Sequence, residues 1–197
     1  MKATIKTVEH LIRALDMCSG DYCVIDIMNQ ADIPASEFEN YYTWNDNHYT
    51  RNRIAKTDKY EVLLVCWEAG QESAIHDFDS HEAWIHPICG QLREERYIQA
   101  KNSNELIKVS SVVLKKNDFS YMRDVGIHRY SNIYGARTVS LVIFSPPLKK
   151  IRVYDKESGA GTWQQIWYDK EYDLLKNQDK HISLDQNASG IGNNPPI

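Results

Sequence analysis

Long hydrophobic runs are missing from this 197-residue chain, and no window approaches the roughly 20 apolar residues that a bilayer-spanning helix requires. Its opening stretch, MKATIKTVEHLIRALD, lacks the unbroken apolar core of a signal peptide. These absences predict a soluble, cytoplasmic protein with no membrane partner. Positive charge is not in excess either, because 23 Lys and Arg stand against 27 Asp and Glu, a net charge of -4. Nucleic acid is therefore not an expected partner.

The four cysteines lack the paired C-x-x-C spacing of many metal and redox sites. Cys66 and Cys89 lie within the apolar runs LLVCW and IHPICG. Buried cysteine usually behaves as a small hydrophobic side chain. We therefore predict that Cys18, Cys23, Cys66 and Cys89 are reduced and mostly buried.

Two helices are predicted before a long β-rich region. Residues 7–18 place apolar side chains on one helical face; these are Val8, Leu11, Ile12 and Leu15, with Met17 as a further candidate. A second helix is predicted from residue 35 to about residue 44. From Tyr49 to Phe144 the chain consists of short β-rich runs broken at Gly, Asn, Asp and Pro clusters, a pattern typical of antiparallel strands in a sandwich or barrel.

Internal repeats and linkers rich in Pro, Gly or Ser are also missing, so the chain is predicted to form one domain. Within it, residues 1–47 form a helical N-terminal segment, residues 48–147 the barrel core, and residues 148–197 C-terminal strands and a tail. The last stretch, NASGIGNNPPI, has little to bury and is expected to lie across the surface or be mobile.

Histidines gather in the β-rich region, where three of them fall between residues 76 and 86. Gly70 precedes His76 by six residues and Gly90 follows it by fourteen. This spacing resembles the first cupin motif, in which two histidines at i and i+2 on one strand point to the same face and bind a metal. Phe78 takes the place of the second histidine here. A later strand, GIHRYSN, offers His128.

Several longer strings in the same order extend the resemblance to the cysteine dioxygenase family of cupins. YTRN resembles the segment that carries a substrate-binding arginine, and LLVCWEAGQESAIHD resembles the strand and turn before the first iron histidine. GQLREERY, VLKKNDFSYMRDVGIHRYSN and VSLVIFSPP are similar to later strands of the family. The resemblance implies an all-β-dominated fold, a small antiparallel cupin barrel (double-stranded β-helix) with N-terminal helices.

The departures from the family fall on active-site positions. The family binds ferrous iron with three histidines, and its closing strand usually carries a Ser-His-Tyr set. This chain has Ser140, Val142 and Phe144 at those three positions. Ala83 stands where animal members have a cysteine that is cross-linked to the tyrosine. The groups that would place or donate a proton near bound oxygen are therefore missing.

His76 and His128 are the predicted metal ligands, because neutral imidazole binds iron, nickel or zinc. Fe(II) is the metal that the resemblance implies. The first candidate for a third ligand is His81, which a bulge at residues 79–81 would turn inward. The second is Glu82, since two histidines and a carboxylate form the facial triad of oxygen-activating iron. His86 has the opposite strand parity and is expected to be structural.

Arg51 is the predicted substrate-binding residue, because a guanidinium can hold a carboxylate through two parallel hydrogen bonds. The resemblance implies that Arg51 binds the carboxylate of an amino-acid thiol. Tyr49 lies two residues away and therefore on the same face of a strand. Phe78, Val142 and Phe144 are expected to fill the barrel with apolar side chains.

Two hypotheses follow for function. The first is a non-haem iron thiol dioxygenase that uses O2 to oxidise a small thiol carboxylate, cysteine or a related compound, to a sulfinate. The second is a catalytically altered or inactive cupin that binds a small carboxylate or a metal. The retained histidines and arginine favour the first, whereas the apolar substitutions favour the second. The oligomeric state is left open.

Overall fold

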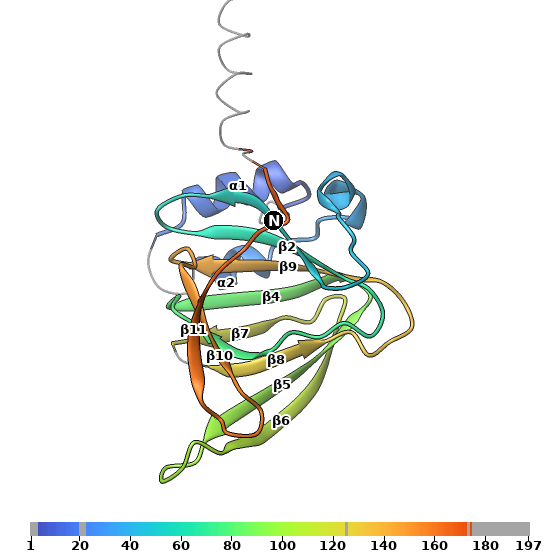
Figure 1. Cartoon of the computed structure of the whole chain (residues 1–197). Helices are drawn as coiled ribbons and strands as arrows, with labels where there is room; N and C mark the ends of the chain where they lie inside the picture. The colour runs from blue at the N-terminus through green and yellow to red at the C-terminus, as the bar shows by residue number, and fades with distance from the viewer. Residues whose placement is uncertain (1–3, 20–22, 125, 173, 175–197) are drawn as a thin grey trace, which may run out of the picture.

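Two six-stranded sheets carry the fold (Figure 1). The computed structural model describes residues 4–19, 23–124, 126–172 and 174. The first sheet has the order β12-β1-β2-β9-β4-β7, and the second has the order β11-β10-β3-β8-β5-β6. Neighbouring strands are antiparallel except for β1 and β12. The structure thus confirms the predicted antiparallel cupin-type fold, although its two sheets are not closed into one hydrogen-bonded barrel.

The strands begin and end close to the predicted β-rich runs. The first sheet contains β1 (Thr50–Lys56), β2 (Glu61–Trp67), β4 (Glu82–Cys89), β7 (Ser120–Arg123), β9 (Thr138–Ser145) and β12 (Lys170–Glu171). The second contains β3 (Ile75–Phe78), β5 (Gln91–Gln99), β6 (Leu106–Lys115), β8 (Ile127–Ser131), β10 (Lys150–Tyr154) and β11 (Gly161–Gln165). Strands β10 to β12 follow the core that the sequence predicted, and the stretch NASGIGNNPPI lies outside the described residues.

The first sheet is covered on both faces, which is why its central strands are almost wholly apolar. Every residue of β2 is buried. Leu63 and Val65 face the inner cluster between the sheets, whereas Val62 and Leu64 face an outer cluster formed with the N-terminal helices. This alternation follows from the two-residue period of a strand. Figure 1 shows the helices lying over the outer side of this sheet.

Helix α1 (Val8–Asp16) confirms the first predicted helix. Thr7 caps it by accepting a hydrogen bond from the His10 amide at 3.1 Å. The four side chains of the predicted apolar face are buried, but Met17 follows the helix and is exposed. The second predicted helix is instead a 3-10 helix, η1 (Ala35–Tyr41), and a short helix α2 (Cys23–Met28) that was not predicted precedes it. Among the described residues no helix is long and apolar enough to cross a bilayer.

The prediction of four reduced cysteines is wrong for two of them. A disulfide joins Cys18, just after α1, to Cys23, at the start of α2. The two Cα atoms lie 5.7 Å apart, within the range that a disulfide spans, although the spacing is not C-x-x-C. Cys66 is free and buried, as predicted, and Cys89 is free and half-buried.

Candidate functional site

A cavity lies between the inner faces of the two sheets, with a volume of about 470 Å³ including its open mouth. Both sheets contribute side chains, mostly apolar, that point inward. The lining consists of Tyr49, Arg51, Leu63, Val65, Trp67, Ser73, His76, Phe78, Ile85, Leu92, His128, Tyr130, Ser140, Val142 and Phe144. Of the five residues predicted to bind metal or substrate, four line this cavity.

His76 and His128 lie side by side because β3 and β8 pair at these two residues. Their ring centroids are 4.3 Å apart. Nδ1 of His76 is 2.9 Å from the Ala74 carbonyl, and Nδ1 of His128 is 2.6 Å from the Gly126 carbonyl. A carbonyl can only accept, so each Nδ1 carries the proton and each Nε2 keeps a lone pair. A hydrogen bond of this kind orients a histidine for metal binding.

Burial keeps both imidazoles neutral. It lowers the pKa of His76 well below the ordinary value of 6.5, and the nearby His128 and Arg51 act in the same direction. Burial also lowers the pKa of His128 to about 4, against the effect of the Gly126 carbonyl. Neutral rings at pH 7 have no proton to displace before Nε2 binds a metal.

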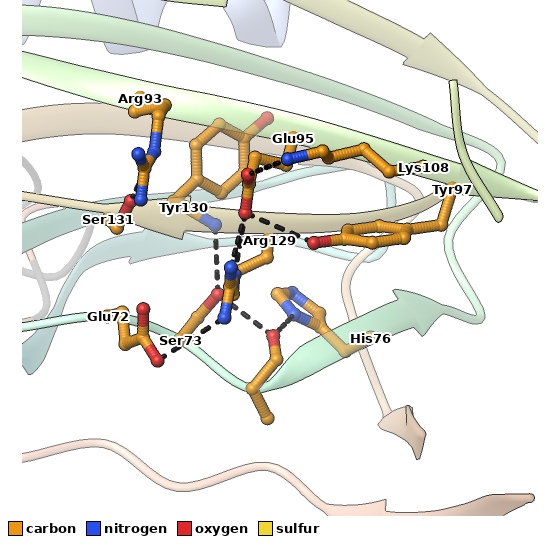
Figure 2. Close-up of polar contacts among 11 residues, drawn as sticks. Glu72, Ser73, His76, Arg93, Glu95, Tyr97, Lys108, Arg129, Tyr130 and Ser131 are labelled. Atoms are coloured by element: carbon orange, nitrogen blue, oxygen red, sulfur yellow. Dashed lines mark hydrogen bonds and ion pairs between the residues drawn. The ribbon is translucent and has the colours of Figure 1, made fainter. Parts of the chain in front are cut away.

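Ser73, which the sequence did not single out, holds the His76 side of the site in place (Figure 2). Its hydroxyl donates to the Ala74 carbonyl at 3.0 Å, the same oxygen that accepts the His76 proton. It also accepts the Tyr130 amide proton at 3.0 Å, and the Ser73 amide donates to the Tyr130 carbonyl at 2.9 Å. Ser73 therefore ties the turn before β3 to strand β8.

An ion-pair network braces the outer face of the same strands (Figure 2). The buried carboxylate of Glu95 accepts hydrogen bonds from the Arg129 guanidinium, from Lys108 at 3.0 Å and from the Tyr97 hydroxyl at 3.1 Å. Arg129 also reaches Glu72 at 3.3 Å. Because Arg129 follows His128 on β8, this network fixes the strand that carries the histidine.

Tyr130 is a second cavity residue that the sequence did not single out. Its ring centroid lies 5.2 Å from that of His128, and its hydroxyl donates to the buried Glu94 carboxylate at 2.8 Å. Ser120 donates to the same carboxylate at 2.7 Å. Burial and the Glu94 charge raise the pKa of Tyr130 well above its ordinary value. Its proton is therefore held by Glu94 and is a poor donor to the cavity.

Apolar rings occupy the side of the cavity where the missing family ligand would stand. Phe78 is buried, with its ring centroid 5.4 Å from that of His128 and 5.3 Å from that of Phe144. Val142 is buried beside them and completes the predicted apolar filling. Across the ranges that the structure describes, no group of three or more His, Cys, Asp or Glu side chains could hold a metal ion.

The structure does not bring His81, the predicted third ligand, to the cavity. Its side chain is half exposed, and Nδ1 lies 2.6 Å from Asp124 Oδ1. The Ser80 hydroxyl beside it lies 2.7 Å from the Pro146 carbonyl and 3.0 Å from the Glu82 carbonyl, which anchors this turn to the segment after β9. Glu82 is also unavailable, since its carboxylate accepts a hydrogen bond from the Tyr121 hydroxyl at 2.6 Å. His86 lies outside the cavity and contacts the Asp118 carbonyl at 2.8 Å.

Arg51 and Tyr49 both line the cavity, on the shared strand face that their spacing predicts. Arg51 is only 7% exposed, yet its Nε and Nη2 atoms have no hydrogen-bond partner among the described residues. Tyr49 stacks on Trp67 with ring centroids 4.4 Å apart. Burial raises the pKa of Tyr49, while the charge of Arg51 opposes that shift. The site thus combines two neutral imidazoles with one buried cation whose Nε and Nη2 atoms have no partner among the described residues.

Comparison with known proteins gives one family match. The family model "Cysteine dioxygenase type I" matches residues 3–157. Human cysteine dioxygenase type 1 is 31% identical over 163 residues, which is 78% of this chain and 82% of the relative. The Danio rerio protein of the same name is 24% identical over 192 residues, 92% of this chain and 96% of the relative.

Two solved structures are similar to this chain at low identity and with TM-scores below 0.5. KdgF from Halomonas sp. is 15% identical with a TM-score of 0.45, covering 55% of this chain and 90% of that one. An oxalate oxidase is 14% identical with a TM-score of 0.44, covering 54% of this chain and 57% of that one.

Proposed function

Because the chain belongs to the cysteine dioxygenase family, we propose that it is a thiol dioxygenase-like protein whose cavity binds a small thiol carboxylate, cysteine or a related compound. In this proposal the thiol is oxidised to a sulfinate with O2. The observation that carries it is the unpaired guanidinium edge of Arg51, which lies in the same cavity as His76 and His128.

A carboxylate suits that edge for geometric reasons. The N–H bonds of Nε and Nη2 run parallel in a guanidinium, so the two atoms without a partner form one two-pronged donor. Leaving a buried donor unsatisfied costs about 1 to 3 kcal/mol, and more for a charged group. A bound carboxylate would satisfy both donors and neutralise the charge. Among the described residues, no acidic side chain lines the cavity to do so.

The two histidines fit a metal in part. We propose that Fe(II), the metal implied by the family, binds through Nε2 of His76 and His128, and zinc or nickel would suit the same donors. With Phe78 at the third position, the remaining donor has to come from the thiol ligand or water. When bound, iron would supply the redox chemistry that lets O2 react with a thiol. The chain itself orients the ligand and excludes water.

A second candidate is a binding protein without turnover, and three side chains favour it. Phe78, Val142 and Phe144 cannot position or donate a proton near the thiol. Thiol oxygenation should therefore be slow or leaky in the natural chain. Replacing them together, by Phe78→His, Val142→His and Phe144→Tyr, should raise the rate. A triple variant that holds iron but gains no rate would show that these three positions do not limit oxygenation.

Oxygen consumption by the iron-supplied full-length protein tests the proposal. The substrates are cysteine, 3-mercaptopropionate and, as a thiol without a carboxylate, 2-mercaptoethanol. Losing the charged pair in Arg51→Ala should cost about 1.5 to 3 kcal/mol, a roughly ten- to hundred-fold weaker apparent affinity for the two carboxylates only. Arg137→Ala removes an exposed arginine paired with Glu68 and serves as the matched control. Arg51-dependent binding without oxygen consumption would favour the binding protein.

A further inference from the structure

The segment between β11 and β12, residues 166–169, crosses from the second sheet to the first and passes Arg51. Figure 1 shows this stretch, coloured orange to red, running from β11 toward the edge of β1. Strand β12 then pairs in parallel with β1, with Asn52 opposite Lys170 and Arg53 opposite Glu171. We call residues 166–169 the crossing segment. The match to the family model ends at residue 157, so the crossing segment lies outside it, whereas Arg51 lies within it.

The crossing segment forms hydrogen bonds with both the amide and the carbonyl of the Arg51 backbone. The Arg51 amide donates to Asp169 Oδ2 at 2.8 Å, and the Asp169 amide donates to the Arg51 carbonyl at 2.9 Å. His48 Nε2 lies 3.0 Å from the other carboxylate oxygen of Asp169. Asp169 is thereby held toward the backbone of Arg51. Its carboxylate pairs with His48 and forms no ion pair with the Arg51 guanidinium.

Aromatic rings of the same segment lie beside the guanidinium. The Arg51 Cζ atom is 5.4 Å from the ring centroid of Trp167 and 6.0 Å from that of Tyr168. Trp167 also lies 5.9 Å, centroid to centroid, from Tyr49. An aromatic face attracts the cation without accepting its in-plane N–H bonds. The rings can therefore hold the guanidinium while leaving its Nε and Nη2 edge for a ligand.

A buried carboxylate fixes the position of Tyr168. The Tyr168 hydroxyl donates to Glu61, which is fully buried and also accepts the Leu148 amide proton at 3.3 Å. The Arg53 guanidinium lies over the Tyr168 ring, with Cζ 4.7 Å from the ring centroid. Tyr168 thus joins the Arg51 side chain to the rigid start of β2.

From these contacts we propose that the crossing segment positions Arg51 for carboxylate binding, with Trp167 and Tyr168 as positioning residues. The inference rests on the proposed carboxylate site and extends it to residues that no motif identifies. The aromatic contacts orient the guanidinium before the ligand arrives. Affinity for a carboxylate therefore depends on Trp167 only as long as Arg51 is present.

Calorimetric titration of the full-length protein with 3-mercaptopropionate tests this dependence. Trp167→Ala should weaken binding about two- to five-fold, the range expected for one partly exposed cation–π contact, and Trp167→Phe should restore most of it. Trp163→Ala is the matched control, because Trp163 is an exposed tryptophan of β11 that contacts Lys150 rather than Arg51. That variant should bind as the natural chain does.

A double-mutant cycle separates positioning from a general structural effect. In the Arg51→Ala background, Trp167→Ala should cause no further loss. Equal losses with and without Arg51, or unchanged binding by Trp167→Ala in a chain that binds the probe, would overturn this inference and leave the proposed carboxylate site standing. If the natural chain does not bind 3-mercaptopropionate, both the proposed site and this inference fail.

Discussion

Replacing Arg51 with methionine should stabilise the ligand-free protein while it strongly weakens carboxylate binding. Most arginine substitutions in a buried site remove favourable contacts and lower stability. Arg51 differs because its Nε and Nη2 donors are buried without partners among the described residues. Methionine keeps an unbranched apolar stem of similar length and removes the charge. The change therefore relieves a cost that the folded state bears only when the cavity is empty.

The size of the effect follows from two opposing contributions. Relieving the unsatisfied buried donors is worth about 1 to 3 kcal/mol. Losing the contact between the guanidinium and the Trp167 ring costs about 0.5 to 1 kcal/mol. The net gain in the free energy of unfolding therefore lies between about 0 and 2.5 kcal/mol. For a chain of this length it corresponds to a rise in Tm of up to roughly 10 °C.

Urea unfolding followed by far-UV circular dichroism measures this change, with unchanged m-values required for a direct comparison. Arg137→Met is the control, because that exposed arginine is paired with Glu68 and its loss should leave stability unchanged or slightly lower. Adding 3-mercaptopropionate should stabilise the natural chain but not Arg51→Met. A clear loss of stability in Arg51→Met without ligand would refute the reasoning, because it would mean that the guanidinium is already satisfied.

Two further predictions concern the metal site and the pH dependence of stability. His76→Ala and His128→Ala should each remove most of the Fe(II) from the iron-loaded protein, as measured by elemental analysis. His86→Ala is the control and should retain the metal. Unchanged metal content in both of the first two variants would show that the two histidines are structural. Burial raises the pKa of Glu95, but the hydrogen bonds from Arg129, Lys108 and Tyr97 outweigh burial and lower this pKa to about 2. This depressed pKa predicts stability that is lost as the pH falls from about 4.5 toward 2, and acid titrations of Glu95→Gln should show a smaller loss across that window.

The fold could be predicted from the sequence where the pattern depends on local periodicity. The alternation of a strand accounts for the residues of β2 that face each cluster, and the four buried positions of α1 follow from the helical repeat. Helix α2 has only six residues, too few for a periodic pattern to stand out. The disulfide between Cys18 and Cys23 depends on how the end of α1 and the start of α2 lie relative to each other, which the spacing of the cysteines does not reveal.

The candidate site could be predicted where a position follows from strand parity or from family strings, as for Arg51 and Tyr49. His81 shows the limit of this approach, since its direction depends on contacts with residues distant in the sequence, its own with Asp124 and that of Ser80 with the Pro146 carbonyl. Trp167 shows another limit. It reaches Arg51 from a segment more than one hundred residues later in the chain, through a strand pairing that no local pattern encodes.

Arg51, His76 and His128 line the cavity although the fold itself does not require polar side chains at these positions. Phe78, Val142 and Phe144 show that apolar side chains are accepted at inward positions of the same sheets. A guanidinium with two unpartnered buried donors and two desolvated imidazoles lining the same cavity cost stability. A bound ligand that pairs with Arg51 and contacts the histidines would recover that cost. The arrangement therefore argues for binding even if the apolar substitutions have slowed or ended turnover, and binding should be measured separately from oxygen consumption.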